Sequence, residues 1–426
     1  MPYRPKVYPD RFSWRCFLVT AWLRFSWRAG GTTIVEGFRF EPSYSFQKRT
    51  IHGRLVTLQA FREPVNHGNE SGQPATALEQ PRVRVGLLAD IQYAPIPIGT
   101  SFTGTPRYYR NALSATRKAA QHFQDEKLPL VLNLGDIVDG KCQDLVHWGG
   151  EGLPQGQDPG LVCTDHVLDA LSIYQAGPVI HAYGNHCLYN MDRESMGAKL
   201  GIPFFAESCG ELVGYHSVLH NGIRFVVLDC YDIAKMRRTK TSSKYKDADT
   251  ILRSKNPNYN TNENSPEGLQ GLDRRYVAFN GAIGPTQLTW LRQILQDART
   301  HKERVILMSH LPIHAGSSGS VCLLWNYKEV LDVLHDYADV ICLALSGHAH
   351  KGGYCRDNES GIHFRVVEAV LENPHPHDTY ATMNIFDDRI EIQGFGNCAS
   401  ATYDLRHIGG VDARPVSEPS NVAKAA

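Results

Sequence analysis

The sequence lacks three features that would each indicate a particular class of protein. No segment approaches the run of about 18 apolar residues that a membrane-spanning helix needs, so no membrane partner is expected. The 44 basic and 44 acidic side chains cancel and no long basic run occurs, which gives no indication of nucleic acid as a partner. The ten cysteines form no Cys-x-x-Cys pair and have no regular spacing. They are predicted to be reduced thiols in a cytoplasmic protein rather than a disulfide framework.

The N-terminal segment has an unusual composition. Its first 28 residues contain five arginines and one acid, Asp10. An Arg-rich, acid-poor N-terminus is typical of an organelle transit peptide, so residues 1–37 could direct the protein to an organelle. The apolar patch Cys16–Leu23 is short and has no clear small-residue cleavage site, which argues against a secretory signal. The alternative to targeting is a disordered or spurious extension.

The length of 426 residues suits one large domain or two ordinary ones. We predict one folded domain over residues 81–397, because clear strand and helix patterns begin near residue 81. Residues 1–80 are interpreted as an extension and linker, and residues 398–426 as a polar tail. Within the domain, residues 232–271 have too few apolar side chains for a core. They are predicted to be a surface insertion that could act as a lid.

A strand that ends on a carboxylate is the centre of the sequence pattern. The apolar run Leu130–Leu134 predicts a buried strand, and Gly135-Asp136 follows it directly. Gly135 lets the backbone turn sharply and leaves Asp136 at the carboxyl end of the strand, where open α/β sheets bind their ligands. An isolated Gly-Asp pair is more often a cap of the next turn, so the functional interpretation depends on repetition.

The preceding segment repeats the pattern. Arg82–Ala89 predicts a strand that ends at Asp90-Ile91-Gln92, and Arg107–Asp125 predicts a helix. Together with the strand at residues 130–134, these segments form a βαβ unit. Asp90 and Asp136 are therefore expected at the ends of parallel strands.

Three later strands are also predicted to end on possible ligands. These ends are Gly184-Asn185-His186, Ser309-His310 and Gly347-His348-Ala349-His350. Alternate residues of an extended chain point the same way, so His348 and His350 can serve one site. Each motif alone has a structural alternative, such as a turn for Gly-Asn-His or a satisfied core histidine for His310. All five motifs in this order favour a shared site over separate coincidences.

The strand ends supply oxygen and imidazole ligands and no thiolate. The set comprises Asp90, Gln92, Asp136, Asn185, His186, His310, His348 and His350. This mixture suits Mn, Fe or Zn better than a thiolate-type structural zinc site or a calcium site. So many polar groups predict two metal ions that share one bridging carboxylate, for which Asp136 is the central candidate. His186 need not bind metal and could instead protonate the leaving oxygen.

These motifs resemble those of a known superfamily, the calcineurin-like metallophosphoesterases. The resemblance is carried by Asp90-x-Gln92, Gly135-Asp136-x-x-Asp139-Gly140, Gly184-Asn185-His186, Ser309-His310 and Gly347-His348-x-His350. Most members have His at the position of Gln92. Gln at this position resembles one branch, the manganese-dependent ADP-ribose/CDP-alcohol diphosphatases. Further segments similar to that branch are Phe102-x-Gly104-Thr105-x-Arg107-Tyr108-Tyr109-Arg110, Phe279-Asn280-Gly281, Leu311-Pro312-Ile313-His314 and Gly352-Gly353-Tyr354.

The resemblance extends from about Val83 to Gly396 and implies a fold and a set of roles. It implies a metallophosphoesterase domain built as a four-layer α/β/β/α sandwich, with two mixed sheets flanked by helices. One metal ion is expected at Asp90, Gln92, Asp136 and His350, and a second at Asp136, Asn185, His310 and His348. The ions are expected to be Mn, with Mg, Fe or Zn as alternatives. Asp136 and His186 are the expected catalytic residues, and Phe102 and Arg107 are expected to contact substrate. The sequence departs from the family at Cys187, where an acidic residue is common.

The expected reaction is hydrolysis of a phosphoanhydride. The resemblance implies conversion of ADP-ribose to AMP and ribose 5-phosphate, and of CDP-choline or CDP-ethanolamine to CMP and the phospho-alcohol. An alternative is a phosphomonoesterase or phosphoprotein phosphatase on the same scaffold, against which Gln92 argues weakly. Another is a non-catalytic binding module that has lost its metal, although all the expected ligand positions are filled. A monomer acting on a small-molecule nucleotide diphosphate is expected.

Overall fold

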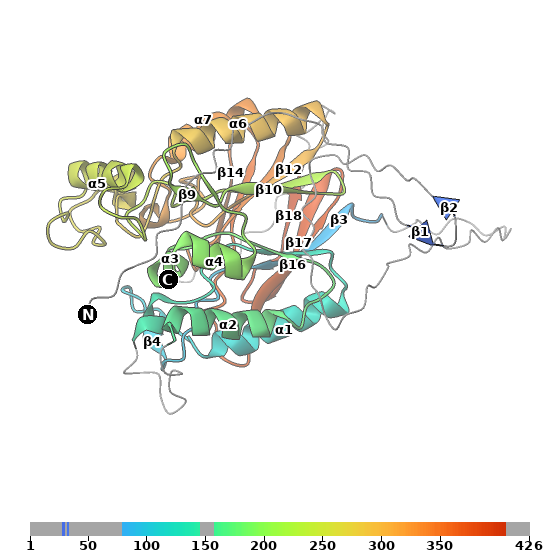
Figure 1. Ribbon diagram of the computed structural model, residues 1–426, viewed down its shortest axis with the longest axis horizontal. Helices are drawn as coiled ribbons and strands as arrows, with labels where there is room; N and C mark the ends of the chain where they lie inside the picture. Colours follow the sequence, from blue (N-terminus) through green and yellow to red (C-terminus); the bar gives the residue numbers. More distant parts are fainter. Residues whose placement is uncertain (1–27, 30–31, 34–78, 145–156, 406–426) are drawn as a thin grey trace. The chain divides into compact units, whose positions relative to one another are not determined.

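The computed structural model describes residues 28–29, 32–33, 79–144 and 157–405 (Figure 1). The chain divides into two units, residues 1–75 and 76–426. In the first unit the described residues form one antiparallel pair, β1 (Arg28–Ala29) with β2 (Thr32–Thr33). The predicted N-terminal extension and linker otherwise lie outside the described residues, as does the tail from residue 406.

The second unit contains two six-stranded sheets, each of which mixes parallel and antiparallel neighbours. In spatial order, the first sheet consists of β18 (Ala401–Asp404), β17 (Arg389–Gly396), β16 (Thr379–Ile385), β3 (Val83–Leu88), β6 (Leu130–Asn133) and β7 (Val179–His181). The second consists of β10 (His216–His220), β11 (Ile223–Val227), β12 (Arg304–Ser309), β13 (Ile341–Ser346), β15 (His363–Val366) and β14 (Gly353–Arg356). Strands β3, β6 and β7 are mutually parallel, as are β11, β12, β13 and β15.

Helices cover the outer faces of the two sheets (Figure 1). Helices α1 (Asn111–Asp125) and α2 (Pro159–Leu171) lie on the first sheet, and α6 (Pro285–Thr300) and α7 (Tyr327–Asp336) lie on the second. The predicted four-layer α/β/β/α sandwich is therefore confirmed. No helix within the described ranges has both the length and the apolar character needed to cross a bilayer.

Shorter elements complete the unit. The helices are α3 (Asn185–Asn190), α4 (Arg193–Leu200) and α5 (Ser243–Lys255). Two-stranded ribbons pair β4 (Gly99–Thr100) with β5 (Pro106–Arg107) and β8 (Phe205–Ala206) with β9 (Leu212–Val213). Single 3₁₀ turns occur at η1 (Gly140–Gln143), η4 (Gly271–Arg275) and η5 (Ser320–Cys322).

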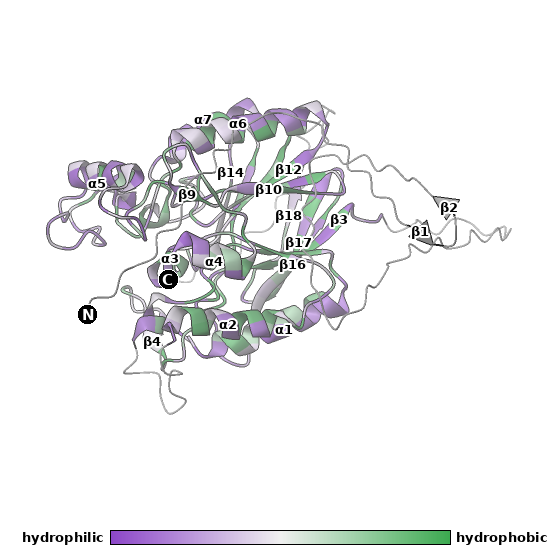
Figure 2. Cartoon of the chain, viewed as in Figure 1, coloured by the Kyte–Doolittle hydropathy of each residue, from purple (hydrophilic) through white to green (hydrophobic). Residues whose placement is uncertain are grey.

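The two sheets pack face to face through an apolar core. Val85 and Leu87 of β3 are buried there together with Phe225, Ile306 and Leu343 of the second sheet. Successive strand residues point to opposite faces, so the alternate residues of β3 turn toward the helices. In Figure 2 the hydrophobic colour is concentrated on the strands and on parts of the outer helices. Burial on both faces explains why a strand such as β13 is apolar over most of its length.

Helix α1 fits closely onto the outer face of β3. A Cβ atom at Gly86 would lie 2.8 Å from Cε1 of Phe123, which is itself fully buried. Gly86 therefore provides the space for the ring that anchors the helix to the sheet. This packing fixes the βαβ unit whose strand ends carry Asp90 and Asp136.

Two sequence expectations about the edges of the domain differ from the structure. The predicted tail at 398–426 contains strand β18, which pairs with β17 because Tyr403 and Leu405 are buried in the core between the sheets. The predicted insertion at 232–271 contains α5, which has a small core of its own. Leu252 is buried there with Ile233 of the same segment and with Trp325, which comes from a distant position in the sequence. The action of this segment as a lid remains a prediction.

Candidate metal centre

The polar residues predicted at strand ends lie at the carboxyl ends of parallel strands from both sheets. Asp90 follows β3, Asp136 follows β6, His310 follows β12, and His348 follows β13. Eight described residues other than glycine have positive φ angles, and four of them belong to this group: Asp90, Gln92, Asp136 and His348, at 50°, 43°, 54° and 65°. Such backbone strain is typical of functional sites, because the surrounding structure must hold it in place.

A first set of donors surrounds Gln92. Its Nε2 atom lies 3.0 Å from Oδ2 of Asp136, 3.0 Å from Nε2 of His350 and 3.5 Å from Oδ1 of Asp90. Nε2 of His350 is 3.5 Å from Oδ1 of Asp90. All four residues are buried or nearly so. The structure therefore brings together the four residues expected at one ion.

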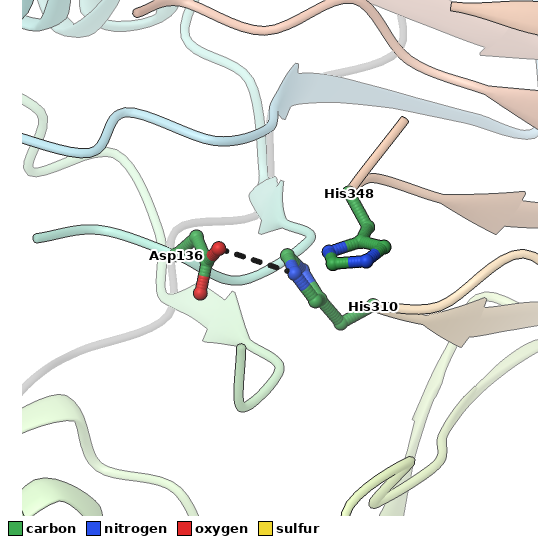
Figure 3. Close-up of side chains that lie close together, drawn as sticks. All are labelled: Asp136, His310 and His348. Atoms are coloured by element: carbon green, nitrogen blue, oxygen red, sulfur yellow. Dashed lines mark ion pairs between the residues drawn. The ribbon is translucent and has the colours of Figure 1, made fainter. Parts of the chain in front are cut away.

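A second set meets the other side of Asp136. Nε2 of His310 lies 3.3 Å from Oδ2 of Asp136 and 3.3 Å from Oδ1 of Asn185. One ligand atom each from Asp136, His310 and His348 lie within 4.8 Å of one another, and Figure 3 shows the three side chains converging. Asp136 thus belongs to both sets, as a bridging carboxylate must.

The charges of the site favour a bound cation. Burial alone lowers the pKa of a histidine, yet Asp136 outweighs this effect and raises the pKa of His310 to about 9. Burial is likewise outweighed at His350, whose pKa is raised to about 9 by hydrogen bonds to Asp90 and Glu372. Burial would raise the pKa of Asp136, but His310 and other nearby histidines hold it low. The carboxylates therefore hold positive charge in a buried site, where divalent cations can replace protons.

One buried atom gives a direct test of whether a metal ion fits. Oε1 of Gln92 is buried and has no hydrogen-bond partner among the described residues. An amide can be turned over without changing its shape, which would place this oxygen among the carboxylate oxygens of Asp90 and Asp136. Oxygen atoms that lie this close to one another are stabilised by a cation between them, and they repel one another when no cation is bound. The donor set therefore fits a hard or borderline divalent ion.

His186 lies beside the two sets with a carboxylate of its own. Its Nδ1 atom is 3.1 Å from Oδ2 of Asp139, and its backbone N–H donates to Oδ1 of Asp136 over 2.8 Å. Burial lowers the pKa of His186, but the charges of Asp139 and Asp136 outweigh it and raise the pKa overall. Cys187 is fully buried, and burial raises the pKa of its thiol to about 12, so the thiol is not poised for oxidation. Asp139 thus places a carboxylate beside the imidazole of His186.

The two residues expected to contact substrate come from the β4–β5 ribbon. Phe102 is 77% exposed between the two strands, which leaves most of its ring available to a ligand. Arg107 lies in β5, and its positive charge acts on Asp139 and His350. Nε of Arg107 is buried without a hydrogen-bond partner within the described part of the chain.

Two residues at this site were not identified from the sequence. Oε1 of Glu372 lies 2.8 Å from Nδ1 of His350, and Oδ1 of Asn280 lies 3.1 Å from Nε2 of His348. Asn280 is part of Phe279-Asn280-Gly281, which carried the branch resemblance but had no assigned role. Glu372 stands in a loop after β15 and belongs to no recognisable motif.

Comparisons with known proteins agree with this geometry. Residues 83–352 match the family model described as calcineurin-like phosphoesterase. A curated protein from Arabidopsis thaliana is 37% identical, and the match covers 77% of this chain and 99% of that protein. A curated protein from Homo sapiens is 33% identical, and the match covers 73% of this chain and 89% of that protein. Both are named manganese-dependent ADP-ribose/CDP-alcohol diphosphatase. The crystal structure of a dimetal phosphatase from Danio rerio is 30% identical, with a TM-score of 0.66, and covers 76% of this chain and 100% of its own.

Proposed function

The chain belongs to the calcineurin-like phosphoesterase family, and we propose that it is a metal-dependent hydrolase of nucleoside diphosphate compounds. ADP-ribose yields AMP and ribose 5-phosphate, and CDP-choline or CDP-ethanolamine yields CMP and the phospho-alcohol. These substrates are taken from the name of the curated relatives. The chain covers 99% of the Arabidopsis thaliana protein and 89% of the Homo sapiens protein. Their name also supports Mn as the preferred ion.

One observation carries the proposal: Asp136 lies between two complete sets of donors. Asp90, Gln92, Asp136 and His350 would hold one divalent ion, and Asp136, Asn185, His310 and His348 would hold the other. A pair of such ions neutralises phosphoryl charge in the transition state and makes water acidic enough to be deprotonated near neutral pH. Both donor sets come from one chain, so a monomer has a complete site. All nine described cysteines are reduced, which supports a cytoplasmic location.

The other residues of the site bind the substrate and handle a proton. Nδ1 of His186 accepts a hydrogen bond from the backbone N–H of Gly140 over 3.0 Å and lies 3.1 Å from Oδ2 of Asp139. This arrangement leaves Nε2 to protonate the leaving oxygen. The leaving phosphate is weakly basic, so this step needs little assistance. Arg107 neutralises a substrate phosphate, and the exposed ring of Phe102 offers a stacking face for the base.

Turnover of defined substrates tests the proposal. Full-length protein supplied with Mn is expected to release AMP from ADP-ribose and CMP from CDP-choline much faster than it cleaves p-nitrophenyl phosphate. Asp136→Ala is expected to abolish release while the circular dichroism spectrum remains that of a folded protein. Cleavage of p-nitrophenyl phosphate alone would overturn the substrate assignment. A folded wild-type protein that retains no metal and cleaves none of the three would overturn the enzyme assignment.

A further inference from the structure

Each histidine of the metal centre has one ring nitrogen turned away from the donor sets and toward an acceptor. Nδ1 of His310 lies 2.8 Å from the carbonyl oxygen of Leu134, and Nδ1 of His350 lies 2.8 Å from Glu372. For His348 the outward atom is instead Nε2, 3.1 Å from Oδ1 of Asn280. A neutral imidazole has one N–H group, and the nitrogen that donates outward leaves the other nitrogen with its lone pair for a metal.

Asn280 can only accept a hydrogen bond from His348. Its side chain is fully buried, and its Nδ2 group donates to three backbone carbonyls. These carbonyls belong to Arg275 at 2.9 Å, Val321 at 2.8 Å and Leu323 at 3.3 Å. The amide is therefore held in one orientation, and Oδ1 must face the ring of His348. An oxygen acceptor at this point requires the proton on Nε2 and leaves Nδ1 as the ligand atom.

Glu372 imposes the opposite arrangement on His350. Its carboxylate accepts from Nδ1–H, so Nε2 carries the lone pair. That Nε2 atom lies 3.0 Å from the side-chain amide of Gln92, within the first donor set. Glu372 is part-buried, with 15% of its side chain exposed, and this limits the competition from water for the bond.

We propose that Asn280 and Glu372 are positioning residues that set opposite ring tautomers in His348 and His350. His348 then offers Nδ1 to one ion, and His350 offers Nε2 to the other. The backbone of His348 makes this division possible. Its φ angle is positive, and its N–H donates to Oδ2 of Asp90 over 2.9 Å, which ties the segment to the first donor set while the ring joins the second. The inference rests on the proposed metal centre and adds the two residues that define its ligand atoms.

Metal affinity tests the role of Glu372. Full-length protein is stripped with a chelator and titrated with Mn, and bound Mn is counted by the loss of the free-ion electron paramagnetic resonance signal. Glu372→Ala is expected to weaken the affected ion by about 10- to 100-fold, as loss of such an outer partner does elsewhere. Glu372→Gln keeps an acceptor oxygen and is expected to restore most of the affinity.

Glu368→Ala provides the matched control, since Glu368 lies in the same loop but pairs with Arg365 over 2.7 Å. It is expected to lower the melting temperature without changing Mn affinity. Wild-type affinity in Glu372→Ala, or an equal loss in Glu368→Ala, would overturn the role of Glu372.

Asn280 allows stability and metal binding to be separated. Asn280→Leu removes both the acceptor and the donors, whereas Asn280→Asp keeps an acceptor oxygen toward His348 but loses donors to the three carbonyls. Both variants are expected to melt earlier than the wild type. Only Asn280→Leu is expected to lose Mn affinity, by about 10-fold or more. Affinities that simply follow the melting temperatures would show a structural role alone and overturn the proposal.

The tautomers can be observed directly. In full-length protein labelled with ¹⁵N-histidine and loaded with diamagnetic zinc, two-bond ¹H–¹⁵N spectra distinguish N–H from metal-bound ring nitrogens. We expect N–H at Nε2 of His348 and at Nδ1 of His350, and the same tautomer in both rings would overturn the inference. A wild type that binds two ions but hydrolyses nothing would contradict the proposed function and leave this inference standing.

Discussion

The two halves of the metal centre differ in charge. The half formed by Asp90, Gln92 and His350 has a carboxylate of its own and a second one, Glu372, behind the histidine. The half formed by Asn185, His310 and His348 consists of neutral ligands, and the acceptors behind its histidines are neutral as well: Leu134 O and Oδ1 of Asn280. Asp136 is common to both.

This difference predicts two ions of unequal affinity. A divalent cation in a buried site gains most where carboxylates offset the loss of its hydration. The Asp90 half is therefore expected to bind its ion tightly, and the Asn185 half to bind a more weakly held ion that substrate phosphate helps to retain. A weakly neutralised ion also remains a stronger electrophile toward a phosphoryl oxygen. The experiments below can break or sharpen the comparison.

Asp136→Ala is expected to have the largest effect, because it removes a ligand from both halves. We expect loss of both ions and a fall in kcat/KM on the order of 10⁴-fold, as for an essential member of a catalytic unit. Steady-state turnover and metal analysis of the purified variant measure the two effects. Retention of one tightly bound ion would show that Asp136 serves only one half.

Paired substitutions in the two halves should have unequal effects. Asp90→Asn is nearly isosteric and removes the charge of the Asp90 half, so the tight phase of a Mn titration is expected to weaken by about 10- to 100-fold. Asn185→Ala is expected to leave that phase unchanged and weaken only the second. Two phases of equal affinity in the wild type, or equal effects of the two variants, would contradict the comparison.

His186 belongs to neither half, so its replacement should separate metal binding from chemistry. His186→Gln is expected to leave both Mn affinities unchanged and to lower kcat by about 100-fold, the lower end for loss of general acid catalysis. The loss should be larger for a substrate with a basic alkoxide leaving group than for ADP-ribose. A weakened Mn affinity would instead show that His186 is a metal ligand.

The sequence was sufficient for residues whose role follows from their place on a strand. Asp136 and His310 stand directly after apolar runs, and a parallel sheet necessarily brings such ends to one edge. It was insufficient where a contact depends on how loops pack. Glu372 has no motif, and its position beside His350 follows from the path of the chain after β15. Likewise, Leu252 of α5 has a core only because Trp325 arrives from more than 70 positions later in the chain.

A carboxylate at another strand end shows how the fold neutralises buried charge without a metal. Asp229 follows β11 and is almost fully buried, yet Nε of Arg193 lies 3.2 Å from its Oδ2 atom. Backbone N–H groups of Gly214 and Tyr231 also donate to it, over 3.2 and 3.0 Å. At Asp90 and Asp136 histidines occupy the place of the arginine. A buried carboxylate at a strand end therefore indicates a metal site only where no arginine or lysine side chain forms an ion pair with it.

Asp229→Asn is expected to have the smallest effect on turnover per folded molecule. It should instead change how the free energy of unfolding depends on pH in the acid range. Burial would raise the pKa of Asp229, but Arg193 and Arg238 outweigh it and lower the pKa below its usual range. The ion pair therefore contributes stability above the unfolded-state pKa of about 3.9, and that contribution is lost as the pH falls through the lower folded-state value. In chelator, the wild-type free energy of unfolding should fall between about pH 5 and pH 3, and Asp229→Asn should flatten this fall. Parallel pH profiles would show that Asp229 is not charged in the fold, and its contrast with the metal-binding strand ends would then be lost.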